Sequence, residues 1–273
     1  MGFLLVDRIR GILVKMRGFI GRVLFRVSRV ILYKLNVDIS LSNSQAQYPE
    51  LTPKEVDFLR QVFSSSITMT SFESLATLAL ACKYIVKSEI PGDFVEAGVW
   101  RGGSSIVAKC FLTGVRTFYL YDTYKGMTTP TVHDYRVGER TNTRTFNHWQ
   151  KHKRSTHNEW VFADLEEVKS NFRNFKLLDE SCKFIEGNVL DTLKTDNVPQ
   201  KISLLRLDTD FYDSTLCELQ VLWPRVVKGG ILILDDYGHW DGARRAVDEY
   251  FYEEEDFFMI PIAGGGGRII QKR

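Results

Sequence analysis

Residues 93–105, DFVEAGVWRGGSS, carry the arrangement that decides the fold. A β-branched and apolar run containing Glu96 ends at Gly98, and Gly102 and Gly103 precede a helix-like segment. In open α/β sheets, a glycine-rich first turn lets the backbone approach a ligand at the carboxyl end of the strand. The spacing does not match G-x-G-x-x-G, and Glu96 would repel a pyrophosphate. The stretch therefore favours an uncharged or cationic ligand over a dinucleotide.

Outward from this stretch, short apolar runs alternate with amphipathic segments. We expect strands at 93–99, 117–122, 182–189, 202–208 and 230–236, and helices at 72–87, 103–113, 164–175, 213–223 and 242–255. This alternation predicts a Rossmann-like, doubly wound α/β fold with a mostly parallel sheet. GGGG at 264–267 separates two further apolar runs, which predicts a hairpin and an antiparallel C-terminal edge.

The composition is that of a globular protein without a dominant charge. The 273 residues are 44% hydrophobic, and 36 basic against 34 acidic residues give a net charge of +2. We therefore expect a sizeable core and no nucleic-acid partner. The four cysteines show no C-x-x-C spacing, which indicates neither a zinc site nor a disulfide framework and fits the cytoplasm.

Residues 1–35 are predicted to form a basic amphipathic helix. Arg8, Lys15, Arg22 and Arg29 recur every seven positions beside an apolar stripe. Charges interrupt the apolar residues too often for a secretory signal or a spanning helix. Two uses stay open: packing on the protein's own domain or on a second copy in a homo-oligomer, and peripheral docking on a membrane surface.

The remaining chain divides into a linker and one domain. Residues 36–55 are polar with two prolines and predict a linker, so the main domain is expected over 56–273. Residues 127–160 are polar and strandless, which is typical of a lid or binding loop. The basic residues of this lid raise the alternative of RNA binding, but no aromatic stacking motif accompanies them: Arg136, Arg140, Arg144, Lys151, Lys153 and Arg154.

Asp122 ends the strand expected at 117–122. Its two oxygens could accept the two hydroxyls of a ribose, although Asp is also a common helix cap. Together with Glu96 and Gly98, Asp122 favours an adenosine site.

Three carboxylates end two other expected strands. LLRLDTDFYDST at 204–215 places Asp208 after a buried run, and GILILDD at 230–236 ends in Asp235 and Asp236. Taken singly, each aspartate could cap a helix or form a surface ion pair. Gathered at one sheet edge, they would repel strongly unless a cation lay among them. Oxygen-only ligands favour a hard ion, Mg²⁺ first, with Mn²⁺ or Ca²⁺ as alternatives.

Five stretches resemble a known family. They are GDFVEAGVWRGGSS at 92–105, YDTYKGM at 121–127, DLEEVKSNF at 164–172, LLRLDTDFYDST at 204–215 and GGILILDDYGHWDGARRAVDEYF at 229–251. Together they look like the macrocin-type (TylF-like) O-methyltransferases, class I enzymes that use S-adenosylmethionine (SAM). The resemblance runs from about residue 67 to the C-terminus. It implies methyl transfer to a sugar hydroxyl of a glycan, a glycolipid or a glycosylated natural product.

The resemblance also implies roles for individual residues. Asp208, Asp235 and Asp236 match the family's metal-binding positions, and a bound Mg²⁺ would orient and acidify the sugar hydroxyl. Asp210 is the first candidate for the general base, and His157 in the lid is the second. The positions implied to bind the cofactor are Ser71, Glu96, Gly98, Val99, Trp100, Asp122, Thr123, Gly126, Gly187 and Asn188.

The chain departs from the family at a few positions. Thr209 stands where the family usually has glycine between the paired aspartates, and Asn188 and Val189 stand where aromatic residues are common. These changes concern the acceptor pocket more than the carboxylates. Two rival functions stay open: metal-dependent methylation of a non-sugar vicinal diol, and a membrane-recruited, non-catalytic SAM-binding module.

Overall fold

The computed structural model describes residues 48–252 and 257–273. The chain divides into two units, 1–56 and 57–273, and the sheet and the cavity described below belong to the second. The amphipathic helix predicted over 1–35 lies outside the described residues. Among those that are described, no helix combines the length and the hydropathy needed to cross a membrane.

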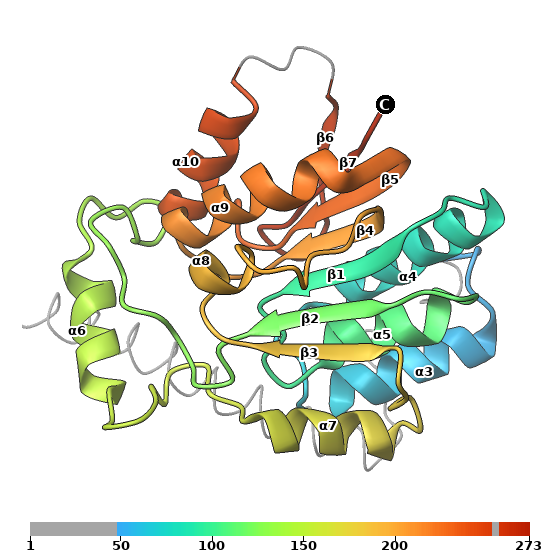
Figure 1. The fold of residues 1–273 in the computed structure, drawn as a ribbon, viewed down its shortest axis with the longest axis horizontal. Helices are drawn as coiled ribbons and strands as arrows, with labels where there is room; N and C mark the ends of the chain where they lie inside the picture. Colours follow the sequence, from blue (N-terminus) through green and yellow to red (C-terminus); the bar gives the residue numbers. More distant parts are fainter. Residues whose placement is uncertain (1–47, 253–256) are drawn as a thin grey trace, which may run out of the picture. The chain divides into compact units, whose positions relative to one another are not determined.

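One seven-stranded sheet organises the second unit, in the order β3-β2-β1-β4-β5-β7-β6 (Figure 1). The strands are β1 Asp93–Ala97, β2 Phe118–Asp122, β3 Cys182–Glu186, β4 Ile202–Leu207, β5 Val226–Leu234, β6 Met259–Pro261 and β7 Arg268–Gln271. Strands β1 to β5 pair in parallel, whereas β7 runs antiparallel to both β5 and β6. The predicted doubly wound fold is thus confirmed. Strand β7 lies between β5 and β6, so β6 is the edge strand.

Helices cover both faces of this sheet (Figure 1). The helices of the described chain are α3 Pro53–Ser64, α4 Phe72–Lys87, α5 Gly103–Phe111, α6 Thr143–His152, α7 Leu165–Asn174, α8 Val189–Thr192, α9 Tyr212–Leu222 and α10 Asp241–Tyr250, with a 3₁₀ turn, η1, at Trp223–Arg225. Helix α6 lies beyond the ends of the strands and covers neither face (Figure 1). Helices α4 and α5 pack together on one face, while α9 packs against α8 and α10 on the other. The strand order reverses direction between β1 and β4, the position where open α/β sheets bind ligands.

The period-two alternation of β4 directs its side chains to different layers. Leu205 and Leu207 belong to the apolar cluster that includes residues of α9 and α10. Arg206 therefore points to the opposite face, and the strand register places it beside Glu96 of β1. Two charged residues consequently lie side by side inside the core.

Three helices were missing from the sequence prediction, the shortest of which is α8, whose first residue lies in the strand expected at 182–189. The lid 127–160 has no named strand, as predicted, but it contains α6. Helix α3 begins inside the predicted linker, where Thr52 and Glu55 form a reciprocal capping box: Thr52 N donates to Glu55 Oε2 at 2.6 Å, and Glu55 N donates to Thr52 Oγ1 at 3.3 Å. The T-P-x-E sequence, with Pro53 as the first helical residue, is a readable start signal that the linker interpretation overlooked.

Candidate active site

The carboxyl ends of β1 to β5 face a cavity of about 310 Å³. The lid lies beyond this edge of the sheet, on the side to which the arrowheads of β1, β2 and β3 point (Figure 1). Most of the predicted site residues line the cavity: Gly98, Val99, Trp100, Asp122, Thr123, Gly126, Gly187, Asn188, Asp208, Asp210, Asp235 and Asp236. Ser71, Glu96 and His157 are not among the lining residues.

The first turn is held together by Asp122. Its Oδ2 accepts hydrogen bonds from the backbone N–H groups of Val99 and Trp100, both at 2.8 Å, and its Oδ1 accepts one from Tyr124 N at 2.8 Å. Burial raises the pKa of Asp122, and these N–H donors oppose the rise. The backbone of Gly98, at φ +87°, passes so close to Asp208 that a Cβ there would lie 1.9 Å from the Asp208 carbonyl oxygen. The turn between β1 and α5 is therefore a fixed rim of the cavity.

Glu96 lies beneath this rim and does not reach the cavity. Its carboxylate is fully buried and accepts hydrogen bonds from Ser104 Oγ at 2.6 Å, from Ser105 Oγ and from Arg206 Nη1 at 2.7 Å. Burial raises the pKa of Glu96, and Arg206 is the main influence that lowers it. The oxygens of Glu96 are thus taken up by α5 and β4, and the structure does not bring this predicted cofactor-binding residue to the lining of the cavity.

Arg206 is the residue that the sequence interpretation missed. Its guanidinium bridges three carboxylates: Nη1 lies 2.7 Å from Glu96 and 2.6 Å from Asp208, and Nη2 lies 2.6 Å from Asp235. Only 2% of the side chain is exposed. An arginine inside the otherwise apolar run LLRLD is a signal in itself, since buried arginine is rare unless it is paired. Part of the positive charge expected among the carboxylates is therefore supplied by the chain.

Asp208, Asp235 and Asp236 still fit a divalent cation. Each offers one carboxylate oxygen within 4.8 Å of the others. Arg206 takes one oxygen of Asp208 and one of Asp235. The second oxygen of each has no hydrogen-bond donor among the described residues. Burial and the neighbouring carboxylates raise the pKa values of Asp208 and Asp236 well above the usual range, although Arg206 lowers that of Asp208. A hard cation would remove this repulsion.

Asp210 reaches the cavity by a different route from the one predicted. Strand β4 ends at Leu207, so Asp210 does not continue its alternation. Instead Asp210 adopts a left-handed conformation at φ +65°, and its N–H donates to Asp236 Oδ2 at 3.0 Å. Burial, followed by the charge of Asp208, raises the pKa of Asp210 to about 7. The residue is held in an uncommon backbone state beside the carboxylate cluster.

Neither His157 nor Ser71 lines the cavity, and each contacts residues outside its lining. The His157 ring packs 4.6 Å from the Phe162 ring, and its Nδ1 lies 3.2 Å from Thr156 Oγ1. Ser71 is the N-cap of α4, where its Oγ accepts a hydrogen bond from Ser74 N at 3.1 Å. The structure therefore does not bring His157, predicted as a catalytic residue, or Ser71, predicted to bind the cofactor, to the lining of the cavity. Thr70, next to Ser71, does line the cavity.

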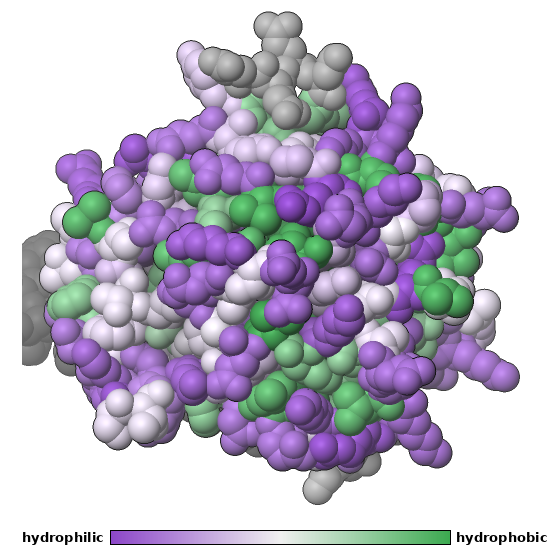
Figure 2. Space-filling view, in the orientation of Figure 1, coloured by the Kyte–Doolittle hydropathy of each residue, from purple (hydrophilic) through white to green (hydrophobic). Residues whose placement is uncertain are grey.

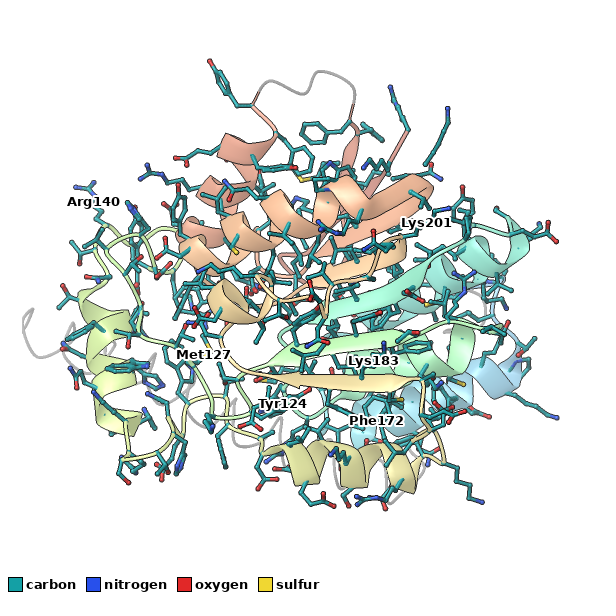
Figure 3. All side chains as sticks on the ribbon, in the orientation of Figure 1. Tyr124, Met127, Arg140, Phe172, Lys183 and Lys201 are labelled. Atoms are coloured by element: carbon teal, nitrogen blue, oxygen red, sulfur yellow. The ribbon has the colours of Figure 1, made fainter. Side chains whose placement is uncertain are left out.

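Aromatic residues form the side of the cavity nearest the lid. Trp160 and Trp240 line it, with ring centroids 6.0 Å apart, and Phe211 packs edge-on against Trp240 at 5.5 Å. Met127, at the base of the lid (Figure 3), pairs its N–H with the carbonyl of Trp160 at 3.1 Å. The two ends of the lid are thereby closed on each other. The sequence showed these aromatics, but their convergence depends on how the lid folds.

The lid is also fastened to α9. Asp134 is fully buried, and its Oδ1 accepts from the backbone N–H of Tyr212, the first residue of α9, at 2.8 Å. Its Oδ2 accepts from Thr131 N at 2.6 Å. Helix α9 has no side-chain cap of its own at Phe211, so the lid supplies the cap that this helix needs.

Thr209, which replaces the family's usual glycine, contacts a second buried acid. Its hydroxyl lies 3.2 Å from Oε2 of Glu218, a fully buried residue of α9. Burial raises the pKa of Glu218 well above the usual range. The threonine thus supplies a hydrogen-bond partner that glycine could not.

Comparison with known proteins gives consistent matches. The family model described as macrocin-O-methyltransferase (TylF) matches residues 33–257. The chain is 36% identical over 188 residues, 67% of either chain, to demethyldecarbamoylnovobiocin O-methyltransferase of Streptomyces niveus. It is 31% identical over 187 residues, 67% of this chain and 69% of the relative, to mycinamicin III 3''-O-methyltransferase of Micromonospora griseorubida. The solved O-methyltransferase NovP superimposes with a TM-score of 0.64 at 32% identity, over 75% of this chain and 81% of NovP.

Proposed function

Because this chain belongs to the macrocin-O-methyltransferase (TylF) family of SAM-dependent O-methyltransferases, we propose that it methylates a sugar hydroxyl beside a divalent cation. The acceptor would be part of a glycan, a glycolipid or a glycosylated natural product. The observation that carries the proposal is the convergence of Asp208, Asp235 and Asp236 within 4.8 Å, on the same cavity as the glycine turn and Asp122.

The cofactor is assigned to the β1 and β2 side of the cavity. There the main chain at Gly98, the carboxylate of Asp122 and the loop at Asn188 form the lining. The fixed backbone turn supports close approach of an adenosine group. The surrounding carboxylates favour a sulfonium, which is a cation, over its neutral product.

The acceptor is assigned to the space between the carboxylates and the aromatic side. Trp160 would contact the apolar face of a sugar ring, and the buried Trp240 would support it from behind. Such apolar walls with few polar groups are typical of ligand pockets. Asp208, Asp235 and Asp236 would hold Mg²⁺, which lowers the pKa of a bound hydroxyl and orients it. This arrangement suits an acceptor with two adjacent hydroxyls.

Asp210 is assigned as the group that takes the proton. It lines the cavity next to the carboxylate cluster, and its main chain is fixed by Asp236. As the acceptor oxygen forms a bond to the methyl carbon, the carbon–sulfur bond of SAM breaks and its electron pair stays on sulfur. The hydroxyl proton passes to the Asp210 carboxylate and from there to solvent. Alignment of the two reactants supplies much of the rate.

Two measurements test the proposed function. Calorimetry should show that S-adenosylhomocysteine binds the full-length protein, and mass spectrometry of an acceptor panel should show the addition of one methyl group in the presence of Mg²⁺. The panel contains free sugars, nucleotide sugars, glycosylated small molecules and catechols. Methylation of catechols alone would overturn the sugar assignment in favour of a non-sugar diol. Full activity after exhaustive chelation would overturn the metal assignment.

A further inference from the structure

Arg136 lies in the lid and is the one arginine or lysine among the described residues that line the cavity. Its guanidinium lies 4.1 Å from the centroid of the Trp240 ring. No carboxylate of the described residues forms an ion pair with it. Two other lid arginines differ, since Arg144 pairs with Glu139 and Arg154 pairs with Glu159. Arg136 thus presents a positive charge that the described chain does not neutralise by direct contact.

The backbone on either side of Arg136 is locked in place. Arg136 forms an isolated antiparallel bridge with Trp240. Val137 N donates to His239 O at 3.0 Å, and Asp241 N donates to Tyr135 O at 2.9 Å. With the Trp240 ring buried beneath the guanidinium, the cation is held before any ligand arrives. A cation fixed in advance loses less entropy on binding than a mobile side chain.

The acidic end of the cavity interacts with Arg136 through charge alone. Burial and Asp208 raise the pKa of Asp210, and Arg136 is among the influences that lower it, but no ion pair or hydrogen bond joins the two residues in the described chain. The direct cationic partner of Asp208 and Asp235 is Arg206, which contacts each at 2.6 Å. No hydrogen bond joins Arg136 to either residue in the described chain. The cavity is therefore polarised, with carboxylates at the strand ends and a guanidinium on the lid.

The surroundings of Arg136 reinforce its charge. Basic residues outnumber acidic ones in the lid: Arg136, Arg140, Arg144, Lys151, Lys153 and Arg154 against Asp134, Glu139 and Glu159. Burial, followed by the charges of neighbouring basic residues that include Lys151, Arg144 and Arg136, lowers the pKa of His148. On the face shown in Figure 2, the surface over α6 is mostly hydrophilic. The lid thus creates a field that favours anions.

We propose that Arg136 binds an anionic group of the acceptor, so that the substrate is an acidic saccharide carrying a carboxylate or a phosphate near the methylated hydroxyl. This inference rests on the proposed function and narrows its substrate class. The planar guanidinium can donate two parallel hydrogen bonds to a carboxylate or to a phosphate. The hydroxyl would lie at the acidic end of the cavity and the anion at the lid, which fixes the direction in which the sugar enters.

The test uses the full-length protein saturated with S-adenosylhomocysteine and Mg²⁺. Calorimetry compares methyl glucuronide with methyl glucoside, and glucose 6-phosphate with glucose. We expect at least one anionic sugar to bind about 10- to 100-fold more tightly than its neutral counterpart, the range of a charged hydrogen bond. The two arms distinguish a uronic acid from a sugar phosphate.

Three variants identify the responsible residue. Arg136→Met, which keeps an apolar stem over Trp240, should abolish the preference for the anion, and Arg136→Lys should keep part of it. Arg140→Met is the matched control, because Arg140 is an exposed lid arginine that does not line the cavity (Figure 3). It should bind both sugars as the wild type does. All variants should bind S-adenosylhomocysteine normally, which also shows that they fold.

Several results would overturn the inference. The first is that anionic sugars bind no more tightly than neutral ones, and the second is that the preference for the anion survives in Arg136→Met. The third is that Arg136→Met binds S-adenosylhomocysteine more weakly, which would assign Arg136 to the cofactor. Tighter binding of a short single-stranded RNA than of either anionic sugar would assign the lid to nucleic acid. Methylation of neutral sugars alone would remove this inference and leave the proposed function, whereas methylation of no saccharide would remove the proposed function itself.

Discussion

The carboxylate at the end of β2 and those at the ends of β4 and β5 are stabilised in different ways. Asp122 is surrounded by backbone N–H donors from Val99, Trp100 and Tyr124. Asp208 and Asp235 are instead held by one side chain, Arg206. Backbone donors cannot leave or change charge, so the turn around Asp122 has a fixed structure. We call Asp122 and these donors the frame. The β4 and β5 ends form a charge cluster whose balance can shift when a cation or proton arrives, as a reactive site requires.

Breaking the cluster at Arg206 should have the largest effect on stability. Arg206→Met leaves Glu96, Asp208 and Asp235 without their shared cation, and losing one partner of a buried ion pair costs about 3–5 kcal/mol. Urea unfolding should show this loss in the free energy of unfolding. Arg101→Met is the control: Arg101 pairs with Glu167 at the surface, and its removal should cost at most about 1 kcal/mol. Equal losses in the two variants would contradict the central role of Arg206.

The second effect, on turnover, should distinguish the cluster from the frame. Asp208→Asn keeps the side-chain volume but removes the charge that would hold the cation, and we expect kcat to fall at least about 100-fold, or about 2.7 kcal/mol in activation free energy. S-adenosylhomocysteine affinity should change little. Asp191→Asn, at a site where 81% of the side chain is exposed, is the control. Retained activity in Asp208→Asn would remove the metal assignment.

The frame should respond to Asp122→Asn in the opposite manner. Asparagine has one acceptor oxygen, so either the N–H groups of Val99 and Trp100 or the N–H of Tyr124 would face an amide nitrogen that cannot accept them. An unsatisfied buried donor costs about 1–3 kcal/mol. We expect lower stability together with weaker S-adenosylhomocysteine binding, measured by thermal unfolding and calorimetry. If only kcat changed, Asp122 would belong to the chemistry and not to the frame.

The last expected effect is a pH dependence of stability to which the cluster contributes. Burial and Asp208 raise the pKa of Asp210 from 3.8 to about 7, so the folded state retains a proton that the unfolded state loses. Without divalent cations, the free energy of unfolding should therefore fall as pH rises from about 4 through 7. Mg²⁺ should reduce the fall, and Asp210→Asn should remove the part of it that Asp210 contributes. A stability that rises over this interval would contradict the raised pKa.

The sequence predicted the fold and most of the cavity because both depend on local patterns. Short apolar runs and the glycines after β1 locate the strand ends, and parallel strands bring those ends to one edge. The ion-pair partners of Arg206 could not be predicted from a local sequence pattern, because they follow from the strand register that pairs Arg206 with Glu96 of β1. His157 was proposed from its closeness in the sequence to a family motif, but such closeness does not determine where a lid residue lies, and His157 does not line the cavity. Asp134 was overlooked because its hydrogen-bond partner, Tyr212, comes from a distant helix.

The Asp134 contact bears on how substrates enter and leave. If residues 127–160 swung outward as a rigid flap, the first turn of α9 would lose its acceptor, and a buried carboxylate would have to be rehydrated. The Asp134 contact therefore opposes an outward movement of residues 127–160. Exchange is easier past Met69, which borders the cavity with 66% of its surface exposed and whose flexible thioether chain can turn aside. The size of the side chain at position 69 would then limit the size of the glycoconjugate whose terminal sugar can enter the cavity.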